Sequence, residues 1–458
     1  MERIMLLFCF FGCTTLLAQG QFTGINTSQK GGHFSTDANP AELLNSSTKY
    51  SFTIFGLSAN ASNNKVGLLD VFNKKDLEDI LLEDNKGIIN LRFDTEIIGP
   101  GFAVKLKKWA FSVGTKTYAK GNAIRINTTL GNVIHDKVNG VETHSIENLN
   151  NQRINATAWS EIGFTIARTI SEDKEHKFNI GTTLKLLFPG TYGNIAAQNF
   201  RGTLVYSPNS ISLTNTTAQL DIAYSEKLAN GIPQAGEYIP LAYGKLNGFA
   251  IDFGINYMWK DDDENDYLAN TGIAVRNLGS MTFSSHKNSF TSYRLNVPNG
   301  SFLQIDNFDN DISTIEQQLI NSGYLQIMET NPDIKVKTPA VLAAYLSLKI
   351  IPKWYVTLYA QGKLGNDSKN NQITTQNTFS VTPHFTTGNL EIYSPWATNE
   401  ISGFTGGIGI RLGGFFIGSE SIITGVVSNT KQGDIHIGYQ FNFDSFSNSD
   451  DCHCSYKQ

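Results

Sequence analysis

The segment FAIDFGINYMW, Phe249–Trp259, decides the fold. Every odd-numbered residue in it is large and apolar or aromatic, whereas the even-numbered residues, Met258 apart, are small or polar. Successive side chains of a β-strand point to opposite faces, so this segment predicts a strand with one apolar face and one polar face. A soluble sandwich and a membrane barrel both contain such strands, and the alternation alone leaves both open.

The same alternation recurs along the chain in segments of about ten residues, the length that a tilted strand needs to cross the hydrocarbon of a membrane. Counting these segments predicts about 14 strands. The apolar positions of four of them are Ile162, Phe164 and Ile166; Phe178, Ile180, Leu184 and Leu186; Phe404, Ile408, Ile410 and Leu412; and Ile435, Ile437, Tyr439, Phe441 and Phe443.

The connections between these segments favour the barrel. Short links occur at Lys107-Lys108, Glu172–His176, Asp261–Asp266, Ile351–Lys353 and Gly413-Gly414, and long polar connections at Gly279–Asp333 and Gly365–Gln372. Bacterial barrels combine short periplasmic turns with long external loops. Trp109, Trp259 and Trp354 each adjoin a short link, as expected of an aromatic girdle at the headgroups. We therefore predict an all-β, transmembrane antiparallel β-barrel.

Two stretches break the alternation. Leu68–Leu82 and Asp311–Ile327 carry apolar residues at helical spacing among polar ones, and each predicts a short amphipathic helix. Such a helix would serve as a plug, a loop cap or a support at the rim, and its apolar stripe is the expected lining of a pocket for apolar solutes.

The ends of the chain differ from the middle. Residues 1–20 have the basic, apolar and small-residue parts of a signal peptide, with cleavage after Gly20 or Ala18; Cys13 as a lipoprotein acceptor is the alternative. No later run of about 18 apolar residues predicts a membrane helix. We divide the chain into a signal peptide (1–20), an N-terminal hatch-like segment (21–48), a barrel (49–444) and a polar C-terminal tail (445–458).

Composition and motifs argue against several functions. The 36 basic and 41 acidic residues give a net charge of −5, which does not suggest nucleic-acid binding. No motif of a hydrolase, a nucleotide-binding protein or a metalloprotease occurs, so we expect neither an enzyme nor a cofactor. The carboxylates of Asp261–Asp266 could hold Ca²⁺, but a charged hairpin turn explains them without an ion. Lys185, Asp221, Asp252 and Arg411 fall on polar strand faces, where they would line a conduit or form ion pairs that fill the lumen.

A family resemblance rests on short motifs. The segment TDANPAEL, Thr36–Leu43, which contains Asn39, Pro40 and Ala41, resembles the N-terminal NPA segment of FadL-like and PorV-like barrels. The segments YSFTIFGLSA (Tyr50–Ala59) and AVRNLG (Ala274–Gly279) resemble an uncharacterised Bacteroidota family of that type, a domain family of unknown function, over most of the mature chain. FadL-like proteins imply a channel for hydrophobic compounds with an N-terminal hatch, and PorV-like proteins imply a secretion-system shuttle.

The last alternating segment also resembles the terminal-strand signal that the barrel-insertion machinery reads. His436, Gly438, Phe441 and Phe443 occupy the expected polar, glycine and aromatic positions. This chain departs from the pattern because fifteen residues follow Phe443, where many such proteins end.

The leading hypothesis is therefore a cell outer-membrane barrel of a Gram-negative bacterium, resembling FadL-like channels for small hydrophobic compounds. The first alternative is a structural or secretion-linked, PorV-like barrel that binds surface or secretion proteins and transports nothing. The second is a soluble periplasmic all-β binding module. Expected partners are outer-membrane lipid, the insertion machinery and hydrophobic small molecules or surface proteins. We further expect Asn39, Pro40 and Ala41 to form a turn at the periplasmic mouth, because Pro40 disfavours helix at Asn39.

Overall fold

The computed structural model describes residues 22–28, 30–82, 87–128, 141–207, 210–225, 228, 242–262, 266–284, 290–305 and 312–444. The signal-peptide prediction for residues 1–20 and the predicted tail from residue 445 lie outside these residues. Within them, no helix has the length and apolar character needed to span a bilayer.

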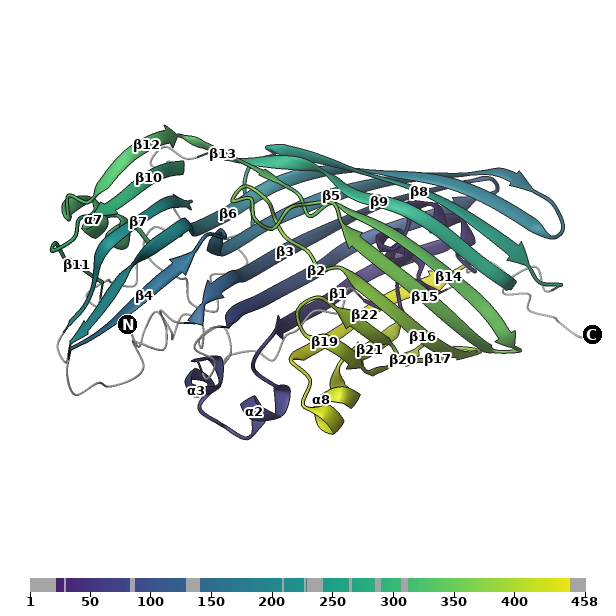
Figure 1. The fold of residues 1–458 in the computed structure, drawn as a ribbon. Coiled ribbons are helices and arrows are strands. Elements are labelled where there is room, and N and C mark those ends of the chain that lie inside the picture. Colours follow the sequence, from purple (N-terminus) through teal and green to yellow (C-terminus); the bar gives the residue numbers. More distant parts are fainter. Residues whose placement is uncertain are drawn as a thin grey trace, which may run out of the picture.

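The described strands form one closed antiparallel ring (Figure 1). The ring closes because β1 pairs with β2 on one side and with the last strand, β22, on the other. The ring has fourteen strands, two of which are interrupted and carry two labels each. They are β1 (Tyr50–Asn63), β2 (Ile88–Leu106), β3 (Trp109–Asn127), β5 (Gln152–Glu172), β6 (His176–Ser207), β8 (Gly248–Lys260), β9 (Tyr267–Ser284), β14 (Val341–Ile351), β15 (Trp354–Lys363), β16 (Thr378–Thr387), β17 (Leu390–Tyr393) with β18 (Trp396–Asn399), β19 (Gly403–Gly406) with β20 (Ile408–Leu412), β21 (Phe415–Ser419) and β22 (Gln432–Phe443). The prediction of a barrel with about 14 strands is confirmed.

The alternation in sequence separates the residues that face the lumen from those that face outward. In β8, Phe249 and Phe253 are 57% and 51% exposed, whereas Asp252 and Asn256 are buried. The apolar face therefore points outward and the polar face lines the lumen, because the period-two pleat separates them. A soluble sandwich would bury the same apolar side chains, so the arrangement of β8 is that of a membrane barrel.

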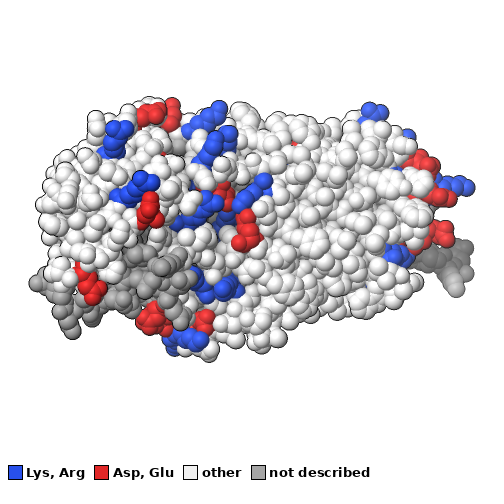
Figure 2. Space-filling view, viewed as in Figure 1, with Lys and Arg blue, Asp and Glu red and all other residues white. Residues whose placement is uncertain are grey.

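The two ends of the barrel differ. We call the end with short links, such as Lys107-Lys108, the turn end, and the opposite end the loop end. Trp109, Trp259 and Trp354 lie at the turn end and are all exposed, at 38%, 46% and 47%. Figure 2 shows charged residues gathered in the loop-end half and at the tip of the turn end, with a band almost free of charge between them.

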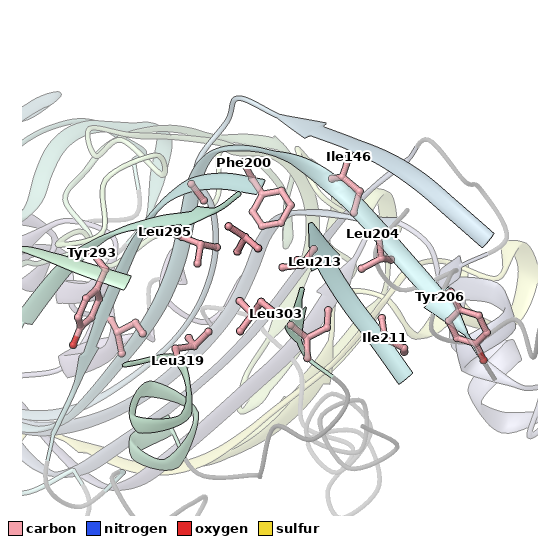
Figure 3. Close-up of a cluster of buried hydrophobic side chains, with 14 residues drawn as sticks. Ile146, Phe200, Leu204, Tyr206, Ile211, Leu213, Tyr293, Leu295, Leu303 and Leu319 are labelled. Atoms are coloured by element: carbon pink, nitrogen blue, oxygen red, sulfur yellow. The ribbon is translucent and has the colours of Figure 1, made fainter. Parts of the chain in front are cut away.

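The loop end carries an outer extension of the wall. The C-terminal part of β6 extends beyond the ring and pairs with two added strands, β4 (Glu142–Asn148) and β7 (Ser210–Tyr224). A helix, α7 (Ile312–Asn321), packs against this sheet. The other added elements are β10 (Phe290–Val297), β11 (Leu303–Gln304) and β12 (Leu325–Asn331), while β13 (Asp333–Lys337) pairs with β9. An apolar cluster that includes Leu204, Leu213, Leu295 and Leu319 forms its core (Figure 3).

This extension corrects the prediction of a long polar connection at Gly279–Asp333. That stretch contains the end of β9, all of β10, β11, α7 and β12, and the start of β13. Its strands are short, and their inward residues, such as Tyr293 and Leu295, alternate with polar ones. β10 and β11 pair with β7, and β12 pairs with β10.

Both predicted helices are shorter than expected. Leu68–Leu82 splits into α2 (Leu68–Phe72) and α3 (Leu77–Leu82), and Lys74 between them has a left-handed φ of 53°. The Asp311–Ile327 prediction holds only for α7, because the left-handed Gly323 follows the helix and Ile327 belongs to β12. Asp311 lies outside the described residues. A further helix, α8 (Ile422–Ser428), was not predicted; it packs against β19 and β22.

Candidate functional site: the lumen and the segments that close it

Residues 22–28 and 30–46, here called the N-terminal segment, lie inside the barrel at its turn end. The segment contains two 3-10 helices, η1 (Gly32–Asp37) and η2 (Pro40–Asn45). Phe22 and Phe34 are 1% exposed and pack against Phe416 of β21, with ring centroids 6.0 and 5.1 Å away. The segment therefore occupies lumen space that the inward strand faces leave.

Asn39 lies between the two 3-10 helices, and Pro40 and Ala41 are the first two residues of η2. Asn39 is extended, with φ −160° and ψ 124°, and Pro40 begins η2. This matches the conformational limits that proline places on itself and on the preceding residue. The Asn39 side chain accepts a hydrogen bond from the Ala41 amide at 2.9 Å and donates one to the Ile255 carbonyl at 2.8 Å. The three residues thus form a turn tied to β8 and pair with no strand.

Glu42 of η2 is the most connected carboxylate of the N-terminal segment. It accepts hydrogen bonds from Asn256 at 2.8 Å, from Asn270 at 2.9 Å and from the Tyr345 hydroxyl. Burial raises the pKa of Glu42, and these hydrogen bonds offset only part of that rise. Strands β8, β9 and β14 therefore hold one acidic side chain of the segment in common.

Glycines on the inward strand faces make room for the segment. A Cβ at Gly181 of β6 would lie 2.5 Å from the Ala41 nitrogen and from the Pro40 carbonyl carbon. A Cβ at Gly101 of β2 would lie 2.8 Å from the His33 ring. Gly254 and Gly272 likewise leave no room for a Cβ beside Asn39. Glycine within a strand often marks a close approach of another chain segment, and here six strand glycines, Gly56 and Gly114 included, face one such segment.

His33 and Asp37 of η1 are two further titratable groups of the segment that face the wall. Burial lowers the pKa of His33 to about 4, so this histidine is neutral near pH 7. Burial by itself raises the pKa of Asp37, but the ammonium of Lys116 on β3 outweighs it, and the net pKa is lowered. Lys116 also pairs with Glu96 at 3.2 Å. Asp37 is therefore an anion built into a charged wall.

A second segment closes the lumen from the loop end. Residues 364–377, between β15 and β16, form what we call the lumen loop. Arg153 of β5, which is 1% exposed, donates to the carbonyls of Asn370 and Gln372 at 3.2 and 3.0 Å. Asn370 in turn donates to Asp221 of β7 at 2.6 Å. The loop thus reaches strands on the far side of the ring from its own.

The predicted polar connection Gly365–Gln372 is a loop between β15 and β16, and Asn366, Ser368, Lys369 and Asn371 within it are exposed. The prediction missed the inward part of the lumen loop that follows, where Thr374 and Gln376 are buried and bind Asn122 of β3 and Ser62 of β1. A polar lumen satisfies polar loop residues as well as water does. Ile373, the apolar residue of the loop, is 4% exposed within a cluster that includes Trp159.

The polar residues predicted for inward faces all lie inside. Lys185 and Asp252 form an ion pair at 2.8 Å. Arg411, 1% exposed, has two guanidinium nitrogens without a hydrogen-bond partner among the described residues. At the hairpin predicted as a charged turn, the Lys349 ammonium lies 2.6 Å from Asp266 and also contacts Asp261. Within the described chain, no group of three His, Cys, Asp or Glu side chains is arranged to hold a metal.

The residues of the predicted terminal-strand signal lie on β22. His436 is buried and bonded to the Tyr393 hydroxyl at 2.6 Å, and a Cβ at Gly438 would collide with Phe416. Phe441 is exposed on the outer face, and Phe443 stacks on Tyr50 of β1. These positions fit both a closing strand and an insertion signal, and the signal stays a prediction.

Sequence reasoning missed the lumen loop and the strand glycines that make room for the N-terminal segment, here called the glycine seats. The glycines carried a readable signal, because Gly254 falls on the polar face of an otherwise regular strand. The lumen loop carried none, since its bonds to Arg153 of β5 and to Asn151 join residues more than 200 positions apart.

Fold and lumen together define an antiparallel β-barrel that segments of its own chain fill. The chain belongs to a family of unknown function, DUF5723, which matches residues 40–420. The predicted resemblance to an uncharacterised family is thereby confirmed, whereas the Bacteroidota origin and the PorV-like relation stay predictions.

Other comparisons give distant similarities. A comparison with curated protein sequences finds no match. Among solved structures, the toluene transporter TbuX of Ralstonia pickettii is 11% identical, with 94% of this chain and 99% of that chain covered and a TM-score of 0.43. The toluene transporter TodX of Pseudomonas putida is 8% identical, with 93% and 96% covered and a TM-score of 0.40. The translocator domain of the autotransporter NalP from Neisseria meningitidis is 7% identical, with 92% and 100% covered and a TM-score of 0.31. At these scores the solved structures add nothing to what the strand pairing establishes.

Proposed function

We propose that this protein is an outer-membrane channel whose lumen is closed at rest by the N-terminal segment and the lumen loop. The membrane location is supported by the outward apolar face, by the band of surface almost free of charge (Figure 2), and by the exposed tryptophans at the turn end. On this reading the turn end is periplasmic and the N-terminal segment is its hatch.

The observation that carries the proposal is the set of glycine seats. Gly181 and Gly101 make room for the backbone of the N-terminal segment and for its His33 ring. At these positions the wall is shaped to receive the segment and packs no side chain of its own. The contacts around Asn39, Asp37 and Glu42 are hydrogen bonds and ion pairs, which water can replace when the segment leaves. Both features suit a segment that docks and undocks.

Electrical recordings of the purified full chain in planar bilayers test this proposal. We expect rare openings from the natural chain and frequent openings when the N-terminal segment is loosened by Asp37→Asn, which removes one of the two negative partners of Lys116, the other being Glu96. The matched control is Asp333→Asn, which changes an exposed carboxylate on β13. Equal and negligible conductance in all three proteins would overturn the channel proposal.

That negative result would support the alternative of a secretion-linked barrel that binds partner proteins. One observation favours this alternative: the lumen is closed from both ends by separate segments. The two functions differ in the surface they need, because a binding barrel does not require the N-terminal segment to move. Pull-down of the same partner by the natural chain and by Asp37→Asn would distinguish it from a channel.

The hypothesis of hydrophobic cargo has a specific requirement. An apolar solute needs apolar lining, and the largest apolar cluster lies in the outer extension under α7 (Figure 3). Leu319 and Ile315 of α7 join this cluster, as expected of a helix that supports the wall. The cluster provides an apolar surface at the loop end. The inward strand faces, in contrast, carry charged side chains such as Lys185 and Asp252.

A further inference from the structure

Arg276 of β9 binds the N-terminal segment and strand β15 at the same time. The residue is buried, and both terminal nitrogens of its guanidinium have partners. Nη1 donates a hydrogen bond to the backbone carbonyl of Asp37 in the N-terminal segment. Nη2 donates to Oε1 of Gln361 on β15 at 2.6 Å and to the Tyr359 hydroxyl at 3.0 Å. One planar side chain therefore ties the N-terminal segment to β15.

Gln361 carries this contact on to the lumen loop. Its Nε2 donates a hydrogen bond to the backbone carbonyl of Gln376 in the lumen loop at 3.1 Å. The side-chain amide of Gln376 donates in turn to the Ser62 hydroxyl of β1 at 2.6 Å, so the wall anchors this part of the loop. Hydrogen bonds thus run from Asp37 through Arg276 and Gln361 to Gln376, and we call these two side chains the Arg276–Gln361 bridge.

The strand register explains why the two side chains of the bridge meet. Arg276 of β9 is paired with Val341 of β14, and Gln361 of β15 is paired with Ala343 of β14. All four residues are buried. Residues two apart on a strand share a face, so Arg276 and Gln361 are diagonal neighbours across β14. Ala343 carries only a methyl group, which lets the long arginine side chain cross β14 to reach Gln361.

The bridge requires one orientation of the Gln361 amide. A guanidinium only donates hydrogen bonds, and a backbone carbonyl only accepts them. Oε1 must therefore face Arg276 so that Nε2 can face the Gln376 carbonyl. A charged donor at Oε1 also polarises the amide and strengthens the hydrogen bond that Nε2 donates. Loss of the Arg276 contact removes both effects, so the bond to the lumen loop weakens.

We propose that the Arg276–Gln361 bridge couples the two closing segments, so that undocking of either segment weakens the docking of the other. When the N-terminal segment leaves, Nη1 of Arg276 loses the Asp37 carbonyl, and the guanidinium turns toward water and releases Gln361. The same bonds act in reverse when the lumen loop leaves, because coupling between two equilibria is reciprocal. This inference rests on the proposed closure of the lumen and adds that its two ends open together.

Two cavities at the bridge provide room for this change. One has a volume of about 60 Å³, and its lining includes Asp37, Arg276, Gln361 and, from the lumen loop, Thr375. The other has a volume of about 40 Å³, and its lining includes Gln361 and Gln376. Polar cavities of this size can hold a few water molecules. Water can therefore take over the hydrogen bonds of the bridge while the strands stay in place.

Hydrogen–deuterium exchange of the full chain in detergent micelles tests this proposal. Gly181→Ala loosens the N-terminal segment through its clash with Ala41, and Arg153→Ala loosens the lumen loop by removing two hydrogen bonds. We expect each variant to speed amide exchange in its own segment and also, at least about fivefold, in the other segment. The factor should be the same in both directions. Loosening that stays confined to the altered segment would overturn the proposal.

Two further variants locate the coupling. Gln361→Met keeps the length of the side chain but removes both hydrogen-bonding groups, and Arg276→Lys keeps the charge but replaces the two-armed guanidinium with a single ammonium. In either background Gly181→Ala should still loosen the N-terminal segment, whereas exchange in the lumen loop should change by less than about twofold. The matched control is Gln304→Met at an exposed position of β11, which should leave the coupling intact. A cross-effect that survives both bridge variants would overturn the assignment.

Exchange and conductance together separate this inference from the proposed function. Coupled exchange in a chain that never conducts would keep the bridge and remove the channel. Conductance in a chain whose two segments exchange independently would keep the channel and remove the coupling.

Discussion

A single methyl group at Gly181 should loosen the N-terminal segment. In Gly181→Ala, the new Cβ would lie 2.5 Å from the Ala41 nitrogen and the Pro40 carbonyl carbon, and both are backbone atoms that cannot rotate away. Ordinary van der Waals contact begins near 3.4 Å. The turn around Pro40 must therefore move by about 1 Å, or the strand must bend.

The cost follows from what that movement breaks. Overpacking of a well-packed site costs about 1–3 kcal/mol. A shift of about 1 Å also stretches the 2.8 Å hydrogen bond from Asn39 to the Ile255 carbonyl beyond its useful range, which loses about another 1 kcal/mol. A total of about 2–4 kcal/mol corresponds to roughly 30- to 1,000-fold in the equilibrium between docked and undocked segment.

The assay is the open probability of single channels in planar bilayers. Gly163→Ala is the matched control, because its Cβ on neighbouring β5 would meet Thr183 at an ordinary 3.5 Å. We expect Gly181→Ala to open at least tenfold more often than the natural chain, and Gly163→Ala to behave like the natural chain. If both variants open equally often, the glycine seat does not control docking and the reasoning fails.

Three further predictions concern other parts of the molecule. Acidification from pH 7 to 5.5 should weaken docking by about 1.4 kcal/mol, because undocked His33 takes up a proton near pH 6.5 whereas docked His33 does so only near 4. Docking stability due to His33 is thus lost as the pH falls below 6.5. His33→Phe should abolish this component of the pH dependence of channel opening; the raised pKa of Glu42 acts in the opposite sense in both proteins, so their difference isolates His33. Phe253→Arg should destabilise folding into lipid vesicles by about 2–4 kcal/mol if it lies near mid-bilayer, whereas Asp262→Arg beyond the strand should have little effect, as urea titration would measure; equal effects would contradict the lipid-facing assignment. Arg153→Ala should make the lumen loop at least tenfold more sensitive to proteolysis, because two buried carbonyls lose a charged donor, and Arg153→Lys should restore part of the protection; unchanged cleavage would exclude Arg153 as the anchor.

Much of the barrel was predictable because its governing pattern is local. In Phe249–Trp259 the pleat alone separates apolar from polar side chains, so the sequence by itself determined which residues face lipid and which face the lumen. The turn at Asn39 was equally local, since proline restricts its own φ and the conformation of the residue before it. Neither inference required knowledge of a distant residue.

The tertiary structure alone decided what fills the lumen. Arg153 and Asn370 are 217 positions apart, and their bond forms only after the ring has brought β5 opposite the lumen loop. The mostly polar stretch Gln372–Gln376 has the composition of a water-exposed loop, yet it is buried, because a closed polar lumen offers it the same hydrogen bonds that water does. Composition therefore cannot tell an inward loop from an outward one. The ion pair of Lys116 with Asp37 has the same origin, because β3 and the N-terminal segment meet only inside the closed barrel.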